Sequence, residues 1–150
     1  MRCNGVKLTK FIQTFDLEVV NQGSDFDTAQ LTIMDVNRPG LQFHHFYDYF
    51  DPRRLQVIGK AEATYLKSMA LERRRKCFDR LSLYDIPALV ICRGLDFCPE
   101  CIDSAKEHEK TLLRSQETTV ELTSLTVEYL NRSLAPCVTQ HGVLLDIYGE

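Results

Sequence analysis

The sequence predicts an α/β fold, a three-layer α/β/α sandwich around a mainly parallel sheet. Short apolar segments of strand length alternate with longer segments that have the periodicity of amphipathic helices. Residues 88–92 form a continuous apolar run between Pro87 and Gly94, which is typical of a central strand buried on both faces. No internal repeat or low-complexity linker interrupts this alternation, and 150 residues suit one ordinary domain.

The first half of the chain is expected to hold one helix and three strands. Apolar residues repeat every three to four positions over residues 7–15, which predicts an amphipathic helix. Residues 17–20 and 31–36 are rich in β-branched side chains and flank a turn-forming segment, so each is expected to be a strand. A third strand is predicted over residues 55–58, where Gly59 ends it.

The middle of the chain is expected to add a long helix, a short helix and a strand. Helical periodicity continues over residues 65–81 before Pro87 interrupts it. A short helix begins near Pro99, because proline suits the first helical position, where its missing N–H has no partner anyway. Residues 111–114 are predicted to form a short strand.

The last third is expected to hold a helix and then a strand. Thr118 and Glu121 have the spacing of a capping box, which predicts a helix that begins there and ends at Pro136. The segment from His141 to Gly149 is a short apolar run led by His-Gly, and it is predicted to be a strand.

Composition excludes several classes of function. A net charge of −3 argues against nucleic acid as a partner, because binding to phosphate backbones depends on clustered lysine and arginine. No apolar run approaches the roughly 20 residues that span a bilayer, so no membrane insertion is expected. The polar segment 1–7 lacks the apolar stretch of a signal peptide. We therefore expect a cytoplasmic protein whose six cysteines are free thiols.

Cys98-Pro99-Glu100-Cys101 is the sharpest local motif. It places a thiol at a helix N-terminus, where the helix dipole favours the thiolate and lowers the thiol pKa. A thiol oxidoreductase is therefore one hypothesis, and it predicts a low-pKa thiol. A single C-x-x-C supplies only half a zinc site, and no second pair lies at ligand spacing. The alternative, an incidental pair of cysteines at a helix start, is favoured.

Two further clusters have plain structural interpretations. His44 and His45 lie among aromatic residues, but neighbouring side chains diverge on a helix or strand, so a shared metal is disfavoured. The aromatic cluster is interpreted as a packing wedge or an interface. The run of residues 73–76, Arg-Arg-Arg-Lys, spreads around a helix, which favours a solvated face over an acidic partner.

His141 is the candidate catalytic residue. An imidazole at the start of a strand that leads into a phosphate loop would lie near a transferred phosphate, where its near-neutral pKa suits proton transfer. The sequence itself contains neither G-x-x-x-x-G-K-[ST] nor G-x-G-x-x-G, so no known phosphate loop is present.

Several segments resemble, in the same order, the N-terminal domain of bacterial HPr kinase/phosphorylases, and the similarity covers essentially all 150 residues. The final segment is the most specific, because in that family it runs into a glycine-rich Walker-type loop and its histidine belongs to the active site. The matching segments are 38–41, 46–50, 54–62, 65–66, 86–95, 113–115, 118–119, 134–136 and 141–149.

The resemblance implies an enzyme that phosphorylates a serine of the phosphocarrier HPr with ATP or pyrophosphate and Mg²⁺, and reverses this by phosphorolysis in carbon catabolite control. It implies hexamers assembled through catalytic domains, and an N-terminal fold similar to a substrate domain of the Mur ligases. Residues 1–135 would be the N-terminal domain, and 136–150 would hold the first strand of the kinase domain. The phosphate loop and general base are missing, so we expect this chain to be inactive alone and to bind none of these cofactors.

Two functions from different classes follow. The first is a structural, regulatory or interaction domain attached to a catalytic half. The alternative is a free-standing small-molecule sensor that retains the ligand-binding capacity of the α/β domain. Stabilisation of the chain by a metabolite would favour the sensor, because a ligand selective for the folded state raises apparent stability.

Overall fold

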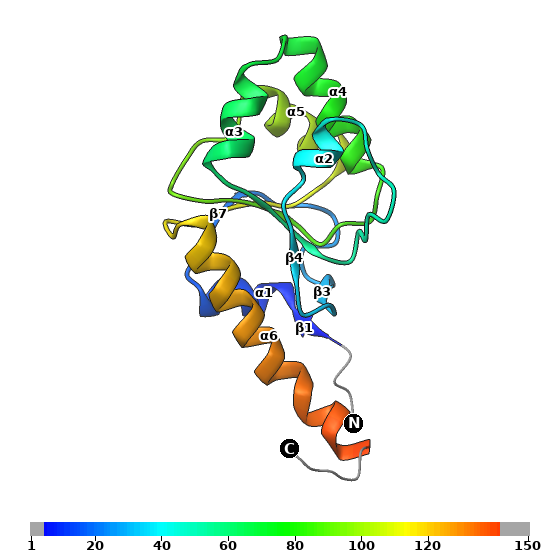
Figure 1. Ribbon diagram of the computed structural model, residues 1–150, viewed down its shortest axis with the longest axis vertical. Helices are drawn as coiled ribbons and strands as arrows, with labels where there is room; N and C mark the ends of the chain where they lie inside the picture. The colour runs from blue at the N-terminus through cyan, green and yellow to red at the C-terminus, as the bar shows by residue number, and fades with distance from the viewer. Residues whose placement is uncertain (1–4, 142–150) are drawn as a thin grey trace.

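The structure, a computed structural model, describes residues 5–141 and has three layers (Figure 1). The middle layer is a sheet of β2 (Glu18–Asn21), β4 (Val36–Asn37), β5 (Leu55–Ile58), β6 (Leu89–Ile91) and β7 (Leu112–Arg114). These five strands lie in the order β2-β7-β6-β5-β4. The neighbours from β4 to β7 run parallel, and β2 pairs antiparallel with β7. The predicted α/β class and the mainly parallel sheet are confirmed.

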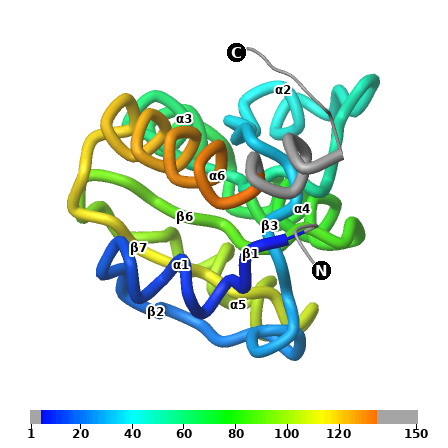
Figure 2. The backbone as a smooth tube through the Cα atoms, turned by 90° about the horizontal axis from the view of Figure 1, so that it is seen from below, coloured from blue at the N-terminus to red at the C-terminus, as the bar shows by residue number. Residues whose placement is uncertain are grey.

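Helices cover both faces of this sheet (Figure 1, Figure 2). The face that we call the α2–α5 face carries α2 (Gly40–Phe43), α3 (Lys60–Lys67), α4 (Leu71–Ser82) and α5 (Pro99–His108). The opposite face, the α1/α6 face, carries α1 (Leu8–Thr14), α6 (Thr119–His141) and a small antiparallel pair of β1 (Val6–Lys7) with β3 (Gln30–Leu31). The connections between consecutive parallel strands from β4 to β7 all cross the α2–α5 face. Crossover connections have the same hand, so they stay on one face when consecutive strands are added to the sheet in one direction.

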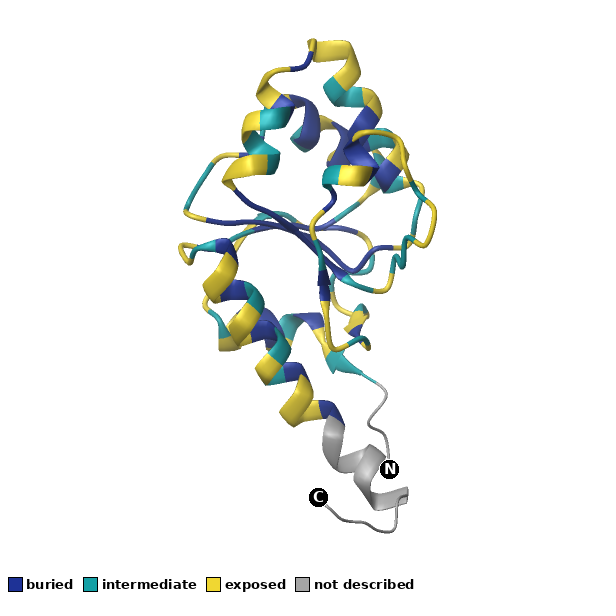
Figure 3. Cartoon of the chain, in the orientation of Figure 1, coloured by how far each residue is buried: buried dark blue, intermediate teal, exposed yellow. Residues whose placement is uncertain are grey.

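Each face of the sheet buries its own hydrophobic core (Figure 3). Side chains alternate along β6, so Val90 enters one core while Leu89 and Ile91 enter the other. Burial of an aliphatic side chain of this size contributes about 1.5–3 kcal/mol relative to exposure. The core of the α1/α6 face includes Leu8, Phe11, Leu31, Leu55, Val57, Leu113, Leu122 and Leu130. The core of the α2–α5 face includes Phe43, Ile58, Leu66, Phe78, Leu81, Phe97 and Leu112.

The predicted strand over residues 31–36 is wrong. The chain forms two separate strands there, because β3 ends at Leu31 and β4 begins at Val36. The Asp35 carboxylate accepts a hydrogen bond of 2.8 Å from the N–H of Val36. Such local side-chain bonding competes with a continuous strand, so the chain bends and passes from the small sheet to the large one. The other predicted strands within residues 5–134 are confirmed to within two residues.

The single helix predicted over residues 65–81 is also wrong, because α3 ends at Lys67 and α4 begins at Leu71. The Ser68 hydroxyl donates a hydrogen bond of 2.6 Å to the carbonyl of Tyr65, which ends α3. The turn that follows buries Met69, which is 9% exposed. Two helices therefore cover the α2–α5 face where one continuous helix was expected.

The α6 helix begins as predicted and ends later than predicted. The N–H of Glu121 donates to the Thr118 hydroxyl at 3.2 Å, which caps the first turn. The helix then continues past Pro136 to His141, because a proline removes one backbone donor and can kink a helix without ending it. The strand predicted over residues 141–149 lies outside the described residues except for His141, which ends α6 and does not begin a strand. The domain boundary at 135/136 stays a prediction. Neither α6 nor any other helix within residues 5–141 combines the length and apolar character needed to cross a membrane.

Candidate functional site

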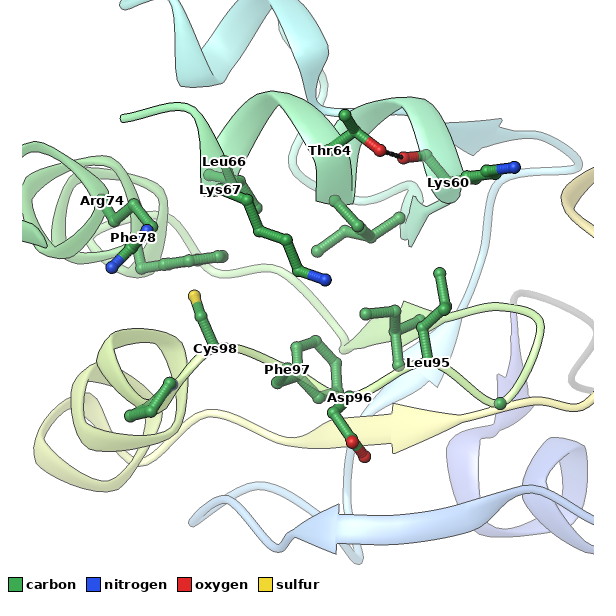
Figure 4. A pocket seen from close by; sticks show the side chains of 15 residues that line it. Lys60, Thr64, Leu66, Lys67, Arg74, Phe78, Leu95, Asp96, Phe97 and Cys98 are labelled. Carbon is green, nitrogen blue, oxygen red and sulfur yellow. Dashed lines mark hydrogen bonds between the residues drawn. The ribbon is translucent and has the colours of Figure 1, made fainter. Parts of the chain in front are cut away.

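A cavity of about 590 Å³ opens beyond the carboxyl ends of β5 and β6 on the α2–α5 face (Figure 4). We call it the carboxyl-end pocket. Open α/β sheets bind ligands in crevices at this edge, and small-molecule sites commonly have volumes of about 300–1,000 Å³. One wall is formed by α3 and α4, and the other by the loop from β6 to α5. Its apolar lining includes Ile58, Leu66, Phe78, Ile91, Leu95 and Phe97.

Gly59 fixes the wall that α3 provides. The Glu62 carboxylate accepts hydrogen bonds of 2.8 Å from both the N–H of Gly59 and the Arg38 guanidinium. A Cβ atom at position 59 would lie 2.3 Å from Oγ1 of Thr119, so glycine is required for this close approach. The first turn of α3 is thereby hydrogen-bonded to the residue after β4, and its N-cap lies close against the start of α6.

The opposite wall depends on left-handed backbone after β6. Arg93 and Gly94 have φ angles of 61° and 64°. The N–H of Arg93 donates to the carbonyl of Glu117, and that of Gly94 donates to the carbonyl of Ser115, both at 2.8 Å. A left-handed arginine costs about 1–2 kcal/mol, and these two hydrogen bonds offset the strain. The loop is therefore held in place by the segment that follows β7.

Positive charge prevails around the pocket. Its described charged lining consists of Lys60, Lys67, Arg74 and Asp96, although the whole chain has a net charge of −3. Figure 4 shows the Lys67 side chain extended into the gap between α3 and the β6–α5 loop, whereas the Lys60 ammonium points along the rim, away from the gap. Neither lysine ammonium has an ion-pair partner among the described residues.

The other two charges of the pocket are already paired. Nε of Arg74 donates to the Glu100 carboxylate at 2.8 Å, and both side chains are mostly buried. Nη1 of Arg74 donates to the carbonyl of Met69 at 3.3 Å. Asp96 is 3.1 Å from an Arg114 nitrogen, and its side chain is 89% exposed. The carboxylate at the rim therefore offsets little of the positive charge inside.

The thiols of the C-x-x-C motif are not activated. Cys98 is the N-cap residue of α5 and lines the pocket, and Cys101 is buried beneath it. Burial raises the pKa of the Cys98 thiol and raises that of Cys101 further. The low thiol pKa that the disfavoured oxidoreductase hypothesis requires is not found, because the desolvation of the thiolate outweighs the effect of the helix dipole. All four cysteines within the described residues, Cys77, Cys92, Cys98 and Cys101, are free thiols as expected.

The two adjacent histidines do not share a ligand. Nδ1 of His44 lies 2.9 Å from the Tyr65 hydroxyl, whereas Nδ1 of His45 lies 3.4 Å from Nη1 of Arg80. No group of three or more His, Cys, Asp or Glu side chains in the described part of the chain is placed to hold a metal ion. The two imidazole rings therefore contact different side chains, as their adjacency predicts.

The neighbouring aromatic residues form a packed cluster. Tyr47 stacks on Tyr84 with ring centroids 4.9 Å apart, and Phe50 packs edge-on against both. The Arg80 guanidinium lies 4.5 Å from the centroid of the Tyr47 ring. Burial raises the pKa of Tyr47 to about 12. Phe43, Tyr47 and Phe50 therefore pack as the wedge interpretation predicts, whereas Phe46 and Tyr49 are 45% and 103% exposed, so the interpretation as an interface stays open.

The basic run on α4 divides between internal pairs and solvent. Arg74 pairs with Glu100, and Arg75 pairs with Asp79 and with Glu107 of α5. The remaining two residues of the run, at positions 73 and 76, are exposed. The run is therefore no continuous basic surface, and the solvated-face interpretation holds for positions 73 and 76 but not for Arg74 and Arg75.

Sequence reasoning placed its candidate residue elsewhere and missed the pocket. His141 is the last residue of α6, and its side chain is outside the described part, so its catalytic role stays a prediction. Lys67 was not singled out, because the approach of α3 to the β6–α5 loop joins distant segments. The available signal was a glycine close behind each of two apolar strands, at Gly59 and Gly94, since ligands bind where such strands end.

Comparison with known proteins identifies relatives along nearly the whole chain. Residues 6–130 match the family described as HPr Serine kinase N terminus. The HPr kinase/phosphorylase of Clostridium perfringens is 41% identical over 145 residues, and that of Clostridium acetobutylicum is 43% identical over 144 residues. The alignments cover 97% and 96% of this chain but only 47% of each relative. The chain thus spans about half the length of the curated relatives it matches.

A solved structure shares the fold. The CBS and DRTGG domains of the regulatory region of Clostridium perfringens pyrophosphatase, complexed with the activator diadenosine tetraphosphate, match with a TM-score of 0.58. The match covers 85% of this chain and 50% of that chain, at 14% sequence identity. At this identity the likeness establishes the α/β fold.

Proposed function

The chain belongs to the family of HPr serine kinase N-terminal domains, and on this premise we propose that it is the non-catalytic N-terminal part of an HPr kinase/phosphorylase. The observation that carries the proposal is an alignment over 97% of the chain with 47% of a relative of that name. The complete enzyme would phosphorylate a serine of HPr with ATP or pyrophosphate and Mg²⁺, and would reverse this by phosphorolysis. It would act in the cytoplasm, in carbon catabolite control, as an oligomer assembled through its catalytic domains.

The residues of this chain do not suit a magnesium-bound nucleotide. The sequence has no Walker-type loop to cradle phosphates. The carboxyl-end pocket contributes one carboxylate, Asp96, which is already paired with Arg114. Phosphoryl transfer depends on positioned metal ligands and a group that orients the nucleophile. We infer that the chain alone has no kinase activity, and phosphorylation of purified HPr by the purified chain with ATP and Mg²⁺ would overturn this.

We propose that His141 acts in the complete enzyme, beside a phosphate site that the downstream part supplies. General acid–base groups contribute about 10²–10⁴-fold to rate. His141→Gln in the longer enzyme should therefore lower kcat for HPr phosphorylation by at least about 10²-fold. The melting temperature of the variant should match that of the parent enzyme. Unchanged kcat would remove His141 from the catalytic role.

A second function, small-molecule sensing, is favoured by the carboxyl-end pocket. It has the volume and apolar lining of a ligand site and lies at the edge where α/β sheets bind ligands. The solved neighbour is a regulatory region complexed with an activator, which is the kind of role we propose. A metabolite that binds only the folded chain at 100 times its Kd should add about 2.7 kcal/mol of stability. A metabolite library that produces no shift in melting temperature would count against this function.

A further inference from the structure

We propose that the carboxyl-end pocket binds a small organic anion with an apolar body, the anionic group lying between Lys67 and Arg74. The proposal rests on the ligand-binding function given above and names the chemical class of the ligand. It follows from three properties of the pocket, which are its unbalanced charge, its apolar lining and its fixed walls.

The charge of the pocket selects an anion. Lys67 extends into the gap, and its ammonium has no ion-pair partner among the described residues (Figure 4). Arg74 lies at one end of the same gap. Its Nε and Nη1 are engaged by Glu100 and by the carbonyl of Met69, which holds the guanidinium in place. Within the described residues Nη2 of Arg74 has no hydrogen-bond acceptor, so it can donate to a ligand.

The apolar lining of the pocket favours a ligand that has an apolar part over an inorganic ion. Ile58, Phe78 and Ile91 are buried, and each contributes to the lining. Leu95 and Phe97 line the loop wall opposite Lys67 (Figure 4). A phosphate or carboxylate alone would fill a small part of about 590 Å³. A ligand that carries a ring or an alkyl chain beside its anionic group would cover these apolar atoms as well.

The walls of the pocket are formed before a ligand arrives. Glu62 links Gly59 to Arg38 on one side, and the hydrogen bonds at Arg93 and Gly94 hold the loop on the other. Binding to a preformed site avoids the cost of ordering loops and side chains, apart from the flexible lysine. The pocket is therefore suited to bind a ligand without rearrangement of the backbone.

The test uses two fluorescent probes of similar shape and different charge. These are the anion 8-anilinonaphthalene-1-sulfonate and the neutral N-phenyl-1-naphthylamine, each titrated into the folded chain. Lys67→Gln should weaken binding of the anionic probe about fivefold, the effect of losing one solvent-accessible charge pair. The same variant should leave the affinity of the neutral probe unchanged. Lys106→Gln is the matched control, because Lys106 is exposed on α5 and does not line the pocket.

A second variant tests whether both probes bind in the carboxyl-end pocket. Ala63 lies on the α3 wall, so Ala63→Phe should fill the pocket and abolish binding of both probes. Near-ultraviolet circular dichroism and the melting temperature establish that each variant is folded. If Ala63→Phe does not fold, Lys67→Gln and Lys106→Gln still decide the matter.

The outcomes separate the two levels of the proposal. If both probes compete for one site and Lys67→Gln affects neither, the anionic class is overturned while small-molecule binding survives. If the folded chain binds neither probe, both the anionic ligand class and the proposed ligand-binding function are overturned. If binding of the anionic probe is equally weakened by Lys106→Gln, surface charge explains the attraction and the assignment to this pocket is wrong.

Discussion

The two faces of the sheet bury comparable sets of apolar side chains but differ in what lies above them. On the α1/α6 face, Phe11, Phe15 and Tyr129 pack together with ring centroids 4.9–6.2 Å apart. On the α2–α5 face, the core borders a cavity of about 590 Å³ whose lining includes Lys67 and Arg74. Substitutions on the first face should therefore change stability alone, whereas substitutions at the second should also change ligand binding.

The largest expected effect comes from removing an aromatic side chain on either face. Phe11 and Phe78 are 0% and 3% exposed, and replacing a buried phenylalanine by alanine costs about 3–5 kcal/mol. Both variants should lose this much free energy of unfolding in urea titrations. Only Phe78 lines the pocket, so only Phe78→Ala should change the affinity of the folded chain for 8-anilinonaphthalene-1-sulfonate. Val120→Ala, at a side chain that is 78% exposed, is the control.

Equal effects of the two substitutions on probe affinity would contradict this division of roles. Such a result would mean that the sheet transmits packing changes from one core to the other. The comparison is made on the folded fraction of each variant, because loss of stability alone lowers the concentration of binding-competent protein.

A smaller effect is expected from adding one methyl group at the turn that begins α3. In Gly59→Ala the new Cβ would lie 2.3 Å from Oγ1 of Thr119 and 2.8 Å from Nη2 of Arg38. Relief of such overpacking costs about 1–3 kcal/mol, and the shift of α3 should weaken probe binding as well. Gly40→Ala is the matched control, since its Cβ meets nothing within 4 Å. Replacing glycine at such a position stabilises by about 0.4–1 kcal/mol. A neutral Gly59→Ala would show that α3 is free to shift.

Sequence patterns predicted the three layers because the strands can be recognised from their own residues, without knowledge of long-range contacts. The continuous apolar run through Val90 could only be a strand buried on both sides, and this was confirmed. The breaks at Asp35 and Ser68 were not predictable, because each depends on one local hydrogen bond that competes with regular structure. The effect of burial on the thiol pKa values could not be predicted for another reason. The helix start at Pro99 was readable, but the burial of Cys101 depends on long-range packing.

The α2–α5 face also holds a buried hydroxyl whose removal should have a modest, pH-dependent effect. The Tyr47 hydroxyl has no hydrogen-bond partner within the described residues, and burial raises the pKa of Tyr47 to about 12. In the unfolded chain a tyrosine ionises near pH 10. The folded state therefore holds the proton more tightly, and its stability falls as pH rises from about 10 to 12.

Tyr47→Phe should remove this loss and keep the ring stacked on Tyr84. Near neutral pH we expect the variant to be as stable as the parent or more stable by about 1 kcal/mol, because an unsatisfied hydroxyl is no longer buried. Tyr49→Phe is the control, because Tyr49 is fully exposed. Each of the two variants has one tyrosine fewer than the parent chain, so they differ only in which tyrosine is replaced. Urea titrations between pH 7 and 11 measure both variants. Parallel stability curves for the two would contradict the assignment to Tyr47.

The smallest effect concerns reactivity without any change in stability, and it compares thiols on the two faces. Cys92 belongs to the core of the α1/α6 face, whereas Cys98 is half-buried in the wall of the carboxyl-end pocket. Burial raises the pKa of both thiols, and for Cys98 it outweighs the helix N-terminus beside it. Because the thiolate is the reactive form, iodoacetamide at pH 7.5 should modify Cys98 more slowly than a cysteine in a short peptide, and Cys92 more slowly still. Peptide mapping by mass spectrometry gives each rate, and the same measurement in urea should bring them together. A Cys98 that reacts faster than the peptide would mean that the dipole prevails over burial, and would restore the thiol oxidoreductase as a function for this face.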